Sequence, residues 1–239
     1  NKIVELESDG KVYYRNLYWY SEFQTVTATT VGMPIGMFYG YQMEGVFKDQ
    51  QDILNHAVQI SDKVITETRP NGTNLVSKNQ GVWIGDVKFK DLNGDGVIDT
   101  DDQTFIGNPN PDFTFGLNNS FNYGAFEFGV YLTGSYGADI LNHTRSVLEG
   151  QTGIFINQAS TVFGRAQFKY LDPNGSTTDP ANVVLANPGT NIPRPTTNDN
   201  NRNNRMSDRF IENGSYLRLQ TLRLGYTLPS SLTKRVKME

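Results

Sequence analysis

Apolar and polar residues alternate with a period of two over residues 112–136, the pattern of β-strands that have one apolar face. The alternation covers residues 112–123, is interrupted by a short turn at Tyr123-Gly124, and continues over residues 125–136. The apolar positions are Phe113, Phe115, Leu117, Phe121, Tyr123, Phe126, Phe128, Val130 and Leu132. The pattern therefore predicts a β-hairpin over residues 112–136.

A third alternating run occupies residues 215–228. From position 222 onward apolar residues fall at every second position, whereas Leu217 and Leu219 are out of phase with them. A β-bulge adds one unpaired residue to a strand and so shifts the phase of the residues beyond it. The sequence predicts a strand with a bulge near Gln220-Thr221.

Two long polar stretches accompany these strands. Residues 46–111 and 139–213 lack sustained alternation and contain clusters of Pro, Asn and Gly, which are typical of loops. Within the second stretch, residues 172–206 are rich in Asn and are predicted to be an exposed surface loop without a core of its own. Residues 24–45 are predicted to form the strand that leads into the first loop.

The alternation fits two β architectures. A transmembrane barrel has about ten residues per strand, with every second one facing lipid, and the strands of a soluble β-sandwich also alternate. The polar positions of residues 112–136 are mainly Thr, Ser, Asn and Gly rather than Lys and Glu, which suits a barrel lumen. The aromatic cluster at residues 13–20 fits an interfacial girdle and, equally well, the packing of a strand. The pattern alone leaves both architectures open.

Composition supports a β-rich chain and excludes several functions. Hydrophobic residues make up 37% of the chain and aromatic residues 12%, with 23 glycines, a profile of strands and turns. The net charge is −4 without any basic run, so nucleic acid is not expected as a partner. The absence of cysteine excludes disulfides and thiolate metal sites. No apolar stretch has the length of a transmembrane helix.

The sequence lacks the signatures of common catalytic sites. It contains no Gly-rich phosphate loop, no Gly-x-Ser-x-Gly elbow and no His-Glu-x-x-His motif. The two histidines, His56 and His143, fall in the predicted loops without a partner at ligand spacing, and we expect both to be solvated loop residues. The chain is therefore predicted not to be an enzyme.

Residues 91–102 carry oxygen-bearing side chains at the spacing of a calcium loop, with Gly96 at the sharp-turn position. Carboxylates confined to so short a segment repel one another unless a cation neutralises them, which predicts a structural calcium ion. The alternative is an Asn-, Asp- and Gly-rich turn held by hydrogen bonds from backbone to side chains. Asp102 stands where a longer Glu usually makes the bidentate contact. The predicted ligands are Asp91, Asn93, Asp95, the backbone carbonyl of Val97, Asp99 and Asp102.

Three motifs follow one another in a fixed order over most of the chain. The first, at residues 31–41, reads Val-Gly-Met-Pro-Ile-Gly-Met-Phe-Tyr-Gly-Tyr. The second joins residues 85–99, which include most of the acidic loop, to residues 106–113, which read Ile-Gly-Asn-Pro-Asn-Pro-Asp-Phe. The third occupies residues 207–219 and ends in Leu-Gly-Tyr-Thr-Leu-Pro at residues 224–229. Together they closely resemble a signature of the SusC/RagA family, the TonB-linked outer-membrane transporters of Bacteroidetes-type bacteria.

This resemblance implies an all-β chain that forms the C-terminal part of an antiparallel transmembrane β-barrel of about 22 strands. The barrel would lie in the lipid of the bacterial outer membrane, with residues 46–111 and 139–213 as long extracellular loops. It would import an oligosaccharide or a peptide, driven by TonB acting on a plug region that is not in this chain. A SusD-like surface lipoprotein would be its partner. The alternative from a different class is a soluble extracellular β-sandwich binding module stabilised by calcium.

Overall fold

The computed structural model describes residues 2–6, 11–19, 22–59, 82–150, 157–196 and 199–235. In these residues β-strands predominate over short helices, and almost all strand pairs are antiparallel. The chain divides into two compact units. Unit 1 comprises Asn1–Gly107 and Leu141–Glu212, and unit 2 comprises Asn108–Ile140 and Asn213–Glu239.

None of the helices in the described part of the chain is both long and apolar enough to cross a membrane.

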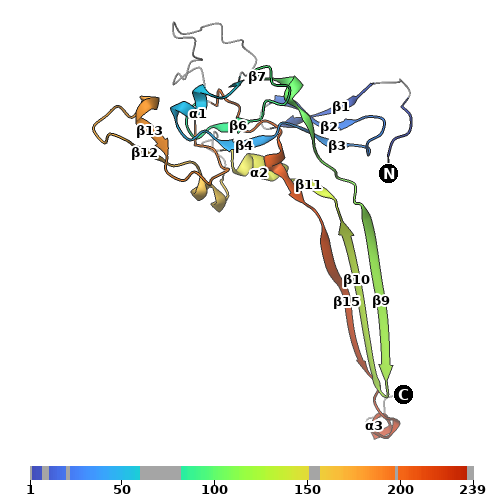
Figure 1. Cartoon of the computed structure of the whole chain (residues 1–239). Helices are drawn as coiled ribbons and strands as arrows, with labels where there is room; N and C mark the ends of the chain where they lie inside the picture. Colours follow the sequence, from blue (N-terminus) through green and yellow to red (C-terminus); the bar gives the residue numbers. More distant parts are fainter. Residues whose placement is uncertain are drawn as a thin grey trace. The chain divides into compact units, whose positions relative to one another are not determined.

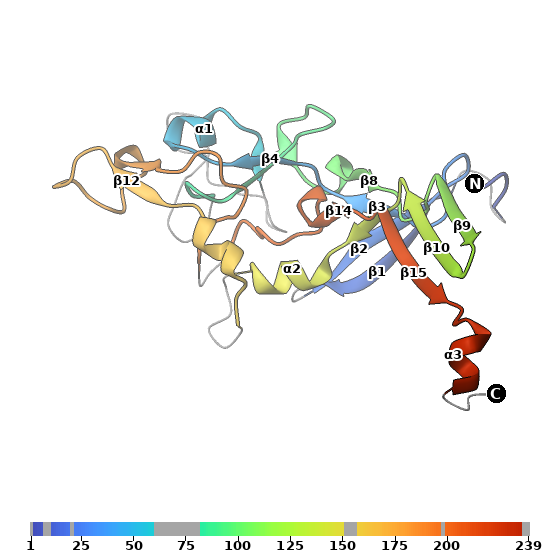
Figure 2. The same ribbon diagram turned by 90° about the horizontal axis from the view of Figure 1, so that it is seen from below.

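Unit 2 is built on three long antiparallel strands, β9 (Phe113–Tyr123), β10 (Phe126–Tyr136) and β15 (Tyr216–Tyr226), in the order β15-β10-β9. Each has 11 residues, close to the length that crosses a bilayer as a tilted strand. They lie side by side in both ribbon views (Figures 1 and 2). A two-residue turn joins β9 to β10, and Gly124 at its first position has φ +57°, a conformation that glycine adopts without a steric penalty. Helix α3 (Ser230–Arg235) follows β15.

The predicted bulge is confirmed in β15. Tyr131 of β10 pairs with Thr221, but the next residue, Leu132, pairs with Leu219, so Gln220 is left without an opposite residue. Directly opposite residues of an antiparallel pair lie on the same face of the sheet. The extra residue therefore brings Leu217 and Leu219 onto the same face as the apolar residues that follow the bulge.

Unit 1 contains a four-stranded sheet in the order β1 (Tyr13–Trp19), β2 (Glu22–Thr29), β3 (Met37–Gly40) and β8 (Thr104–Gly107). The prediction of one strand over residues 24–45 is wrong, because the chain reverses between β2 and β3. Gly32 and Gly36 have φ values of +86° and +66° in this reversal. The hydroxyl of Thr29 accepts a hydrogen bond from the Gly36 N–H at 3.0 Å and closes the turn.

Shorter elements make up the rest of unit 1. Strand β4 (Met43–Val46) pairs with β6 (Val87–Phe89), β5 (Val58–Gln59) pairs in parallel with β7 (Val97–Ile98), and β12 (Phe168–Tyr170) pairs with β13 (Val183–Leu185). The helical segments are α1 (Gln50–Leu54), α2 (His143–Leu148) and the 3-10 turns η1 (Thr100–Asp102), η2 (Ser160–Gly164), η3 (Pro180–Asn182) and η4 (Asp208–Phe210). Two three-residue strands, β11 (Asp139–Leu141) and β14 (Ile211–Asn213), lie where the chain passes between the units.

The predicted loops of unit 1 have a core of their own. One apolar cluster contains Trp19, Val26 and Phe38 from the four-stranded sheet together with Met206 and Phe210. The expectation that residues 172–206 form a coreless surface loop is therefore wrong at its C-terminal end, where residues 201, 203, 204, 205 and 206 are all buried. The reason lies in polar contacts that the side chains of this segment make with distant backbone.

The aromatic cluster at residues 13–20 contains both a core residue and exposed residues. Trp19 is only 1% exposed, packs against Phe210 and donates its indole N–H to the Asn204 carbonyl at 2.6 Å. It is a core residue. Tyr13, Tyr14 and Tyr18 are exposed along β1, and Tyr20 lies outside the described residues.

Candidate functional site

The acidic loop is folded by hydrogen bonds from its own backbone. The two carboxylate oxygens of Asp91 accept the N–H groups of Gly94 at 2.6 Å and Gly96 at 2.9 Å. Asn93 accepts the N–H of Asp95 at 2.9 Å, and Asp95 accepts that of Val97 at 2.8 Å. These are the bonds of the alternative considered from the sequence, a turn rich in Asn, Asp and Gly.

The last two predicted ligands close the loop. Asp102 is fully buried, and its carboxylate accepts the N–H groups of Leu92 at 2.7 Å, Asn93 at 3.4 Å and Asp99 at 2.9 Å. Asp99 is the N-cap of η1 and accepts the Asp101 N–H at 2.8 Å. Asp102 thus joins the start of the loop to its end through backbone hydrogen bonds.

The fit of a cation to this loop rests on the remaining acceptor capacity of its oxygens. Each carboxylate oxygen has two lone pairs, so an oxygen that accepts one N–H can still bind an ion. The described residues nevertheless contain no group of three or more Asp, Glu, His or Cys side chains gathered closely enough to hold a metal. Calcium binding by residues 91–102 remains a prediction from the spacing of their oxygen-bearing side chains.

His56 is half-buried, contrary to the prediction that both histidines are solvated, whereas His143 is exposed at the start of α2. The Nε2 atom of His56 lies 2.8 Å from the Phe89 carbonyl oxygen, and its ring packs edge-on against Phe47. The ring of His143 lies 4.8 Å from that of Trp19, measured between centroids. Both rings pack against aromatic neighbours, a contact that sequence spacing does not reveal.

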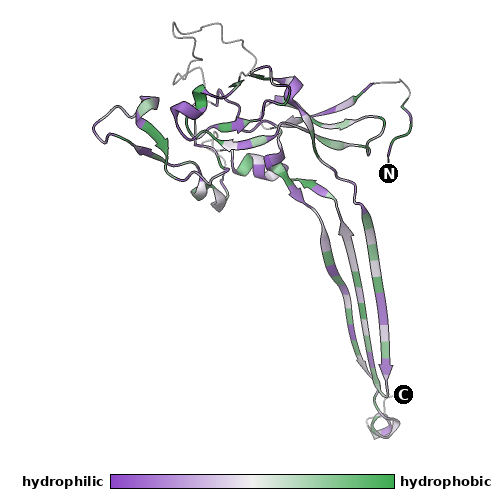
Figure 3. Ribbon diagram, viewed as in Figure 1, coloured by the Kyte–Doolittle hydropathy of each residue, from purple (hydrophilic) through white to green (hydrophobic). Residues whose placement is uncertain are grey.

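One face of the three-stranded sheet in unit 2 is apolar and exposed. Phe128 pairs with Phe121 on one side and Leu224 on the other, and the same register continues along all three strands. Alternating hydrophobic and hydrophilic bands are visible along β9, β10 and β15 in Figure 3. Apart from Asn119 and Gly134, the face consists of Phe113, Phe115, Leu117, Phe121, Tyr123, Phe126, Phe128, Val130, Leu132, Tyr136, Leu217, Leu219, Leu222, Leu224 and Tyr226.

The exposure of this face distinguishes it from the inner face of a soluble sandwich. Phe115 is 44% exposed and Leu224 is 77% exposed, whereas the inner faces of a sandwich are covered by a second sheet. The Phe115 ring lies over Gly134 in the neighbouring strand, so the aromatic side chain covers backbone that a glycine would leave bare. The opposite face is polar and includes an exposed ion pair between Arg223 and Glu127 at 3.3 Å. An exposed apolar surface of this extent marks contact with lipid or protein.

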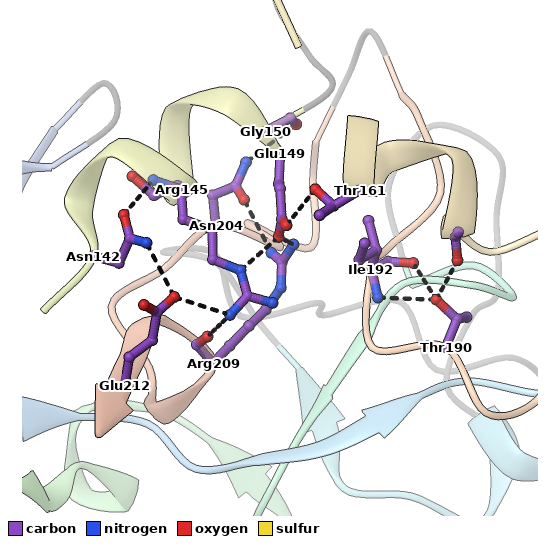
Figure 4. A network of polar contacts seen from close by, with 12 residues as sticks. Asn142, Arg145, Glu149, Gly150, Thr161, Thr190, Ile192, Asn204, Arg209 and Glu212 are labelled. Atoms are coloured by element: carbon purple, nitrogen blue, oxygen red, sulfur yellow. Dashed lines mark hydrogen bonds and ion pairs between the residues drawn. The ribbon is translucent and has the colours of Figure 1, made fainter. Parts of the chain in front are cut away.

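A buried ionic network holds the C-terminal part of unit 1 together (Figure 4). Glu149 at the end of α2 pairs with Arg145 at 3.0 Å and with Arg209 at 2.8 Å, and it accepts the Thr161 hydroxyl at 2.8 Å. Glu149 and Arg209 are both almost completely buried. Burial lowers the pKa of Arg209 to about 10, and the Glu149 carboxylate beside it opposes that shift. Breaking a buried pair of this kind leaves an unpaired charge, which is strongly destabilising.

Residues 199–210, which we call the polar strap, run through unit 1 beside β6. Strand β6 pairs with β4 along one edge, and side-chain amides satisfy its other edge. Asn203 accepts the Val87 N–H at 2.7 Å, Asn201 donates to the Val87 carbonyl at 2.9 Å, and Gln59 accepts the Phe89 N–H at 2.6 Å. An amide carries both a donor and an acceptor, so it can replace the backbone of a missing strand.

The polar strap also approaches β3 very closely. The Tyr41 N–H donates to the Met206 carbonyl at 3.0 Å, and the Asp208 N–H donates to the Tyr41 carbonyl at 3.0 Å. A Cβ atom at Gly40 would lie 2.5 Å from the Met206 carbonyl oxygen, so only glycine allows this approach. The Gly-Tyr pair that ends the first motif is the sequence signal for this close approach.

Known proteins resemble this chain along its whole length. No family model matches it. It is 29% identical over 239 residues, 100% of its length, to TonB-dependent receptor P3 of Formosa agariphila, of which the match covers 20%. With TonB-dependent receptor P39 of the same organism it shares 29% identity over 242 aligned residues, which cover 97% of this chain and 20% of the relative. The chain thus spans about a fifth of the length of these curated relatives.

Solved structures show the same fold. A structure of the RagAB peptide importer in the closed-closed state matches 97% of this chain and 20% of that chain, with a TM-score of 0.56 and 17% identity. A structure of the RagAB peptide transporter matches 87% of this chain and 18% of that chain, with a TM-score of 0.51. The fold is that of an all-β barrel fragment of a TonB-dependent transporter. Within that class, the resemblance to SusC/RagA-type transporters predicted from the three motifs is confirmed.

Proposed function

We propose that this chain is part of a TonB-dependent outer-membrane transporter that imports a nutrient. The observation that carries the proposal is the similarity to TonB-dependent receptors over the whole chain. The exposed apolar face of β9, β10 and β15 supports it, because strands of 11 residues with one apolar face suit a lipid-facing barrel wall. The apolar face would contact lipid, and the opposite, polar face would line the lumen.

The substrate class and the partners are further parts of this proposal. We expect an oligosaccharide or a peptide as the substrate, TonB acting through a plug region, and a SusD-like lipoprotein over the outer mouth. One structural neighbour is described as a peptide importer, which supports the peptide class. The long segments 46–111 and 139–213 would lie on the extracellular side, where such a lipoprotein and the substrate arrive.

Uptake by cells tests the transport function. Cells that carry the full-length protein are compared with a strain that lacks it and with a strain that lacks TonB, each supplied with a labelled oligopeptide or oligosaccharide. We expect accumulation of one substrate class only when both the protein and TonB are present. Equal uptake in all three strains would contradict the proposal.

Two simpler measurements address the location and the partner. The full-length protein should enter the outer-membrane fraction and require detergent for extraction, whereas a soluble β-sandwich module would be released without detergent. A surface lipoprotein should co-purify with the full-length protein in mild detergent. Recovery of the transporter alone from gently solubilised membranes would contradict the proposed partner while leaving the membrane assignment intact.

A further inference from the structure

Two carboxylates in unit 1, one fully buried and one half-buried, share one amide group. The Nδ2 atom of Asn203 donates to Asp86 at 3.1 Å and to Asp199 at 2.7 Å. The backbone N–H of Asn203 also donates to both oxygens of Asp199, at 3.0 and 2.9 Å. Asp86 is fully buried. A single residue of the polar strap therefore holds two acidic groups close together.

The two carboxylates are neutralised unequally. The guanidinium of Arg194 contacts both oxygens of Asp86, at 2.7 and 3.2 Å, and the Trp83 N–H donates to the same carboxylate at 2.7 Å. Asp199 is held instead by the neutral donors of Asn203. Of the charged groups that act on Asp199, Asp86 opposes its ionisation, whereas Arg194 and Arg205 favour it.

Arg205 does not compensate for this imbalance by a direct bond. Its guanidinium lies 5.0 Å from the centre of the Tyr41 ring and 4.5 Å from that of Phe89, and it donates to the Asn201 carbonyl at 2.8 Å. The aromatic rings hold this cation in place. Its effect on Asp199 is therefore an attraction at a distance, weaker than the ion pair that Asp86 has with Arg194.

Asn203 also connects the carboxylates to β6. Its Oδ1 atom accepts the Val87 N–H at 2.7 Å and the Asn201 amide at 2.9 Å. The orientation of one side chain is thus fixed by the strand on one side and by two acidic groups on the other. Any change in the charge of those groups acts on the attachment of the strap to β6.

We propose that Asp199 is a proton-operated latch, whose protonation tightens the attachment of the polar strap to β6. A proton on this carboxyl group removes the repulsion from Asp86. Burial also raises the pKa of Asp86, but the ion pair with Arg194 and the hydrogen bonds from Asn203 and the Trp83 N–H oppose that shift, so we assign the proton to Asp199. The latch belongs to the folding of unit 1, so it does not depend on the transport function proposed above.

The electrostatics support this assignment. Burial raises the pKa of Asp199 to about 6, Asp86 adds to the shift, and the Asn203 N–H, Arg194 and Arg205 oppose it. A carboxyl group with a raised pKa binds its proton more tightly in the folded than in the opened state. The strap therefore gains stability as the pH falls through about 6, and it loses that stability as the pH rises.

Hydrogen exchange of the full-length protein in detergent tests the latch. Peptides that contain residues 84–90 and 199–206 are followed between pH 5 and pH 7.5, with rates corrected for intrinsic exchange. We expect the opening equilibrium of the strap to be about ten-fold less favourable at pH 5 than at pH 7.5, with protection beginning to rise near pH 6. Asp199→Asn, which mimics the protonated carboxyl, should give the protection seen at low pH at both pH values.

Asp172→Asn is the matched control, because Asp172 is an exposed carboxylate in the same unit and its replacement should leave the pH dependence unchanged. Protection of the wild-type strap that does not vary with pH would overturn the proposal. So would an Asp199→Asn protein that retains the wild-type pH dependence. If that variant does not fold, the wild-type protein alone decides, because protection of the strap that is the same at pH 7.5 and pH 5 excludes Asp199 as the titrating group.

Discussion

At the scale of single residues, side-chain amides do the work of a strand along β6. Gln59, Asn201 and Asn203 supply the donors and acceptors that the free edge of this strand requires. A buried backbone N–H or C=O without a partner costs about 1–3 kcal/mol. Each of these amides therefore stabilises unit 1 by satisfying a backbone group of β6. An Asn-rich segment is buried here because its amides are matched to a buried edge.

Charge at the apolar face of unit 2 tests which side of the sheet contacts lipid. Phe115 and Asn118 lie on opposite faces of β9. We expect Phe115→Arg to destabilise the barrel by about 2–4 kcal/mol if it lies near the bilayer midplane, because a charge there faces hydrocarbon. Asn118→Arg is the control and should cost much less, since it projects from the polar face.

The unfolding free energies of the two variants are compared in denaturant titrations of the full-length protein in lipid vesicles. Equal destabilisation by both substitutions would contradict the assignment of the faces.

Calcium binding by the acidic loop is tested by removing the ion and, separately, by removing a ligand. We expect a chelator to increase hydrogen exchange in residues 86–108 while β9 and β10 keep their protection, because all predicted ligands come from the loop. Asp95→Ala should have the same effect in the presence of calcium.

Asp102→Asn separates the ion from the fold of the loop. Asp102 accepts three backbone N–H groups, so this substitution should loosen the loop with or without calcium. A loop whose exchange is the same in calcium and in chelator, with no heat of calcium binding in calorimetry, would exclude the site.

At the scale of elements, one extra residue determines which side chains β15 presents to each face. Gln220 is left out of the pairing with β10, and its side chain accepts a hydrogen bond from the Thr133 hydroxyl at 3.3 Å. Since side chains alternate with a period of two, a shift by one residue moves every side chain beyond it to the other face.

Deletion of Gln220 and Thr221 together should therefore prevent assembly of the barrel. Leu219 would then stand opposite Tyr131 instead of Leu132, so Leu217 and Leu219 would move to the polar face and Arg218 to the apolar face. We expect little or no folded protein in the outer membrane, measured as the fraction that resists unfolding in detergent without heating. Deletion of Gln220 alone removes the bulge but keeps Leu219 opposite Leu132, so it should assemble almost normally. Normal assembly of the double deletion would contradict the assignment of the faces of β15.

At the scale of the whole molecule, the predicted outer loops differ in accessibility. The connection between β12 and β13 is exposed from residue 171 to 174 and from 176 to 179, whereas the polar strap is buried over most of its length. Backbone must open locally before a protease can cut it. The two segments therefore offer a test of membrane orientation and of packing in a single experiment.

We expect proteinase K added to intact cells to cut within residues 171–179 and to leave residues 199–210 intact, as identified by mass spectrometry of the fragments. Cuts that appear only after the outer membrane is opened would reverse the proposed orientation. Rapid cutting within the strap in intact cells would instead show that the strap is not buried in unit 1.

The local features of unit 2 could be predicted from the sequence, because strands with one apolar face carry their pattern in adjacent residues. Alternation predicted β9, β10 and their apolar face, the glycine predicted the turn, and the phase error of Leu217 and Leu219 predicted the bulge. The three motifs supplied the transporter resemblance. The spacing of the acidic residues predicted a calcium loop. The hydrogen bonds of the loop also fit a turn that is closed by its own backbone.

Only the tertiary structure determined the interior of unit 1. Asn201 and Asn203 contact β6 over more than a hundred residues of intervening sequence, and Glu149 meets Arg209 from a different part of the chain. A polar residue is compatible with solvent or with a buried partner, and its own neighbours in the sequence do not distinguish the two. Apolar alternation fixes a face locally, whereas the burial of a polar side chain depends on whether distant backbone has a donor or acceptor left to satisfy.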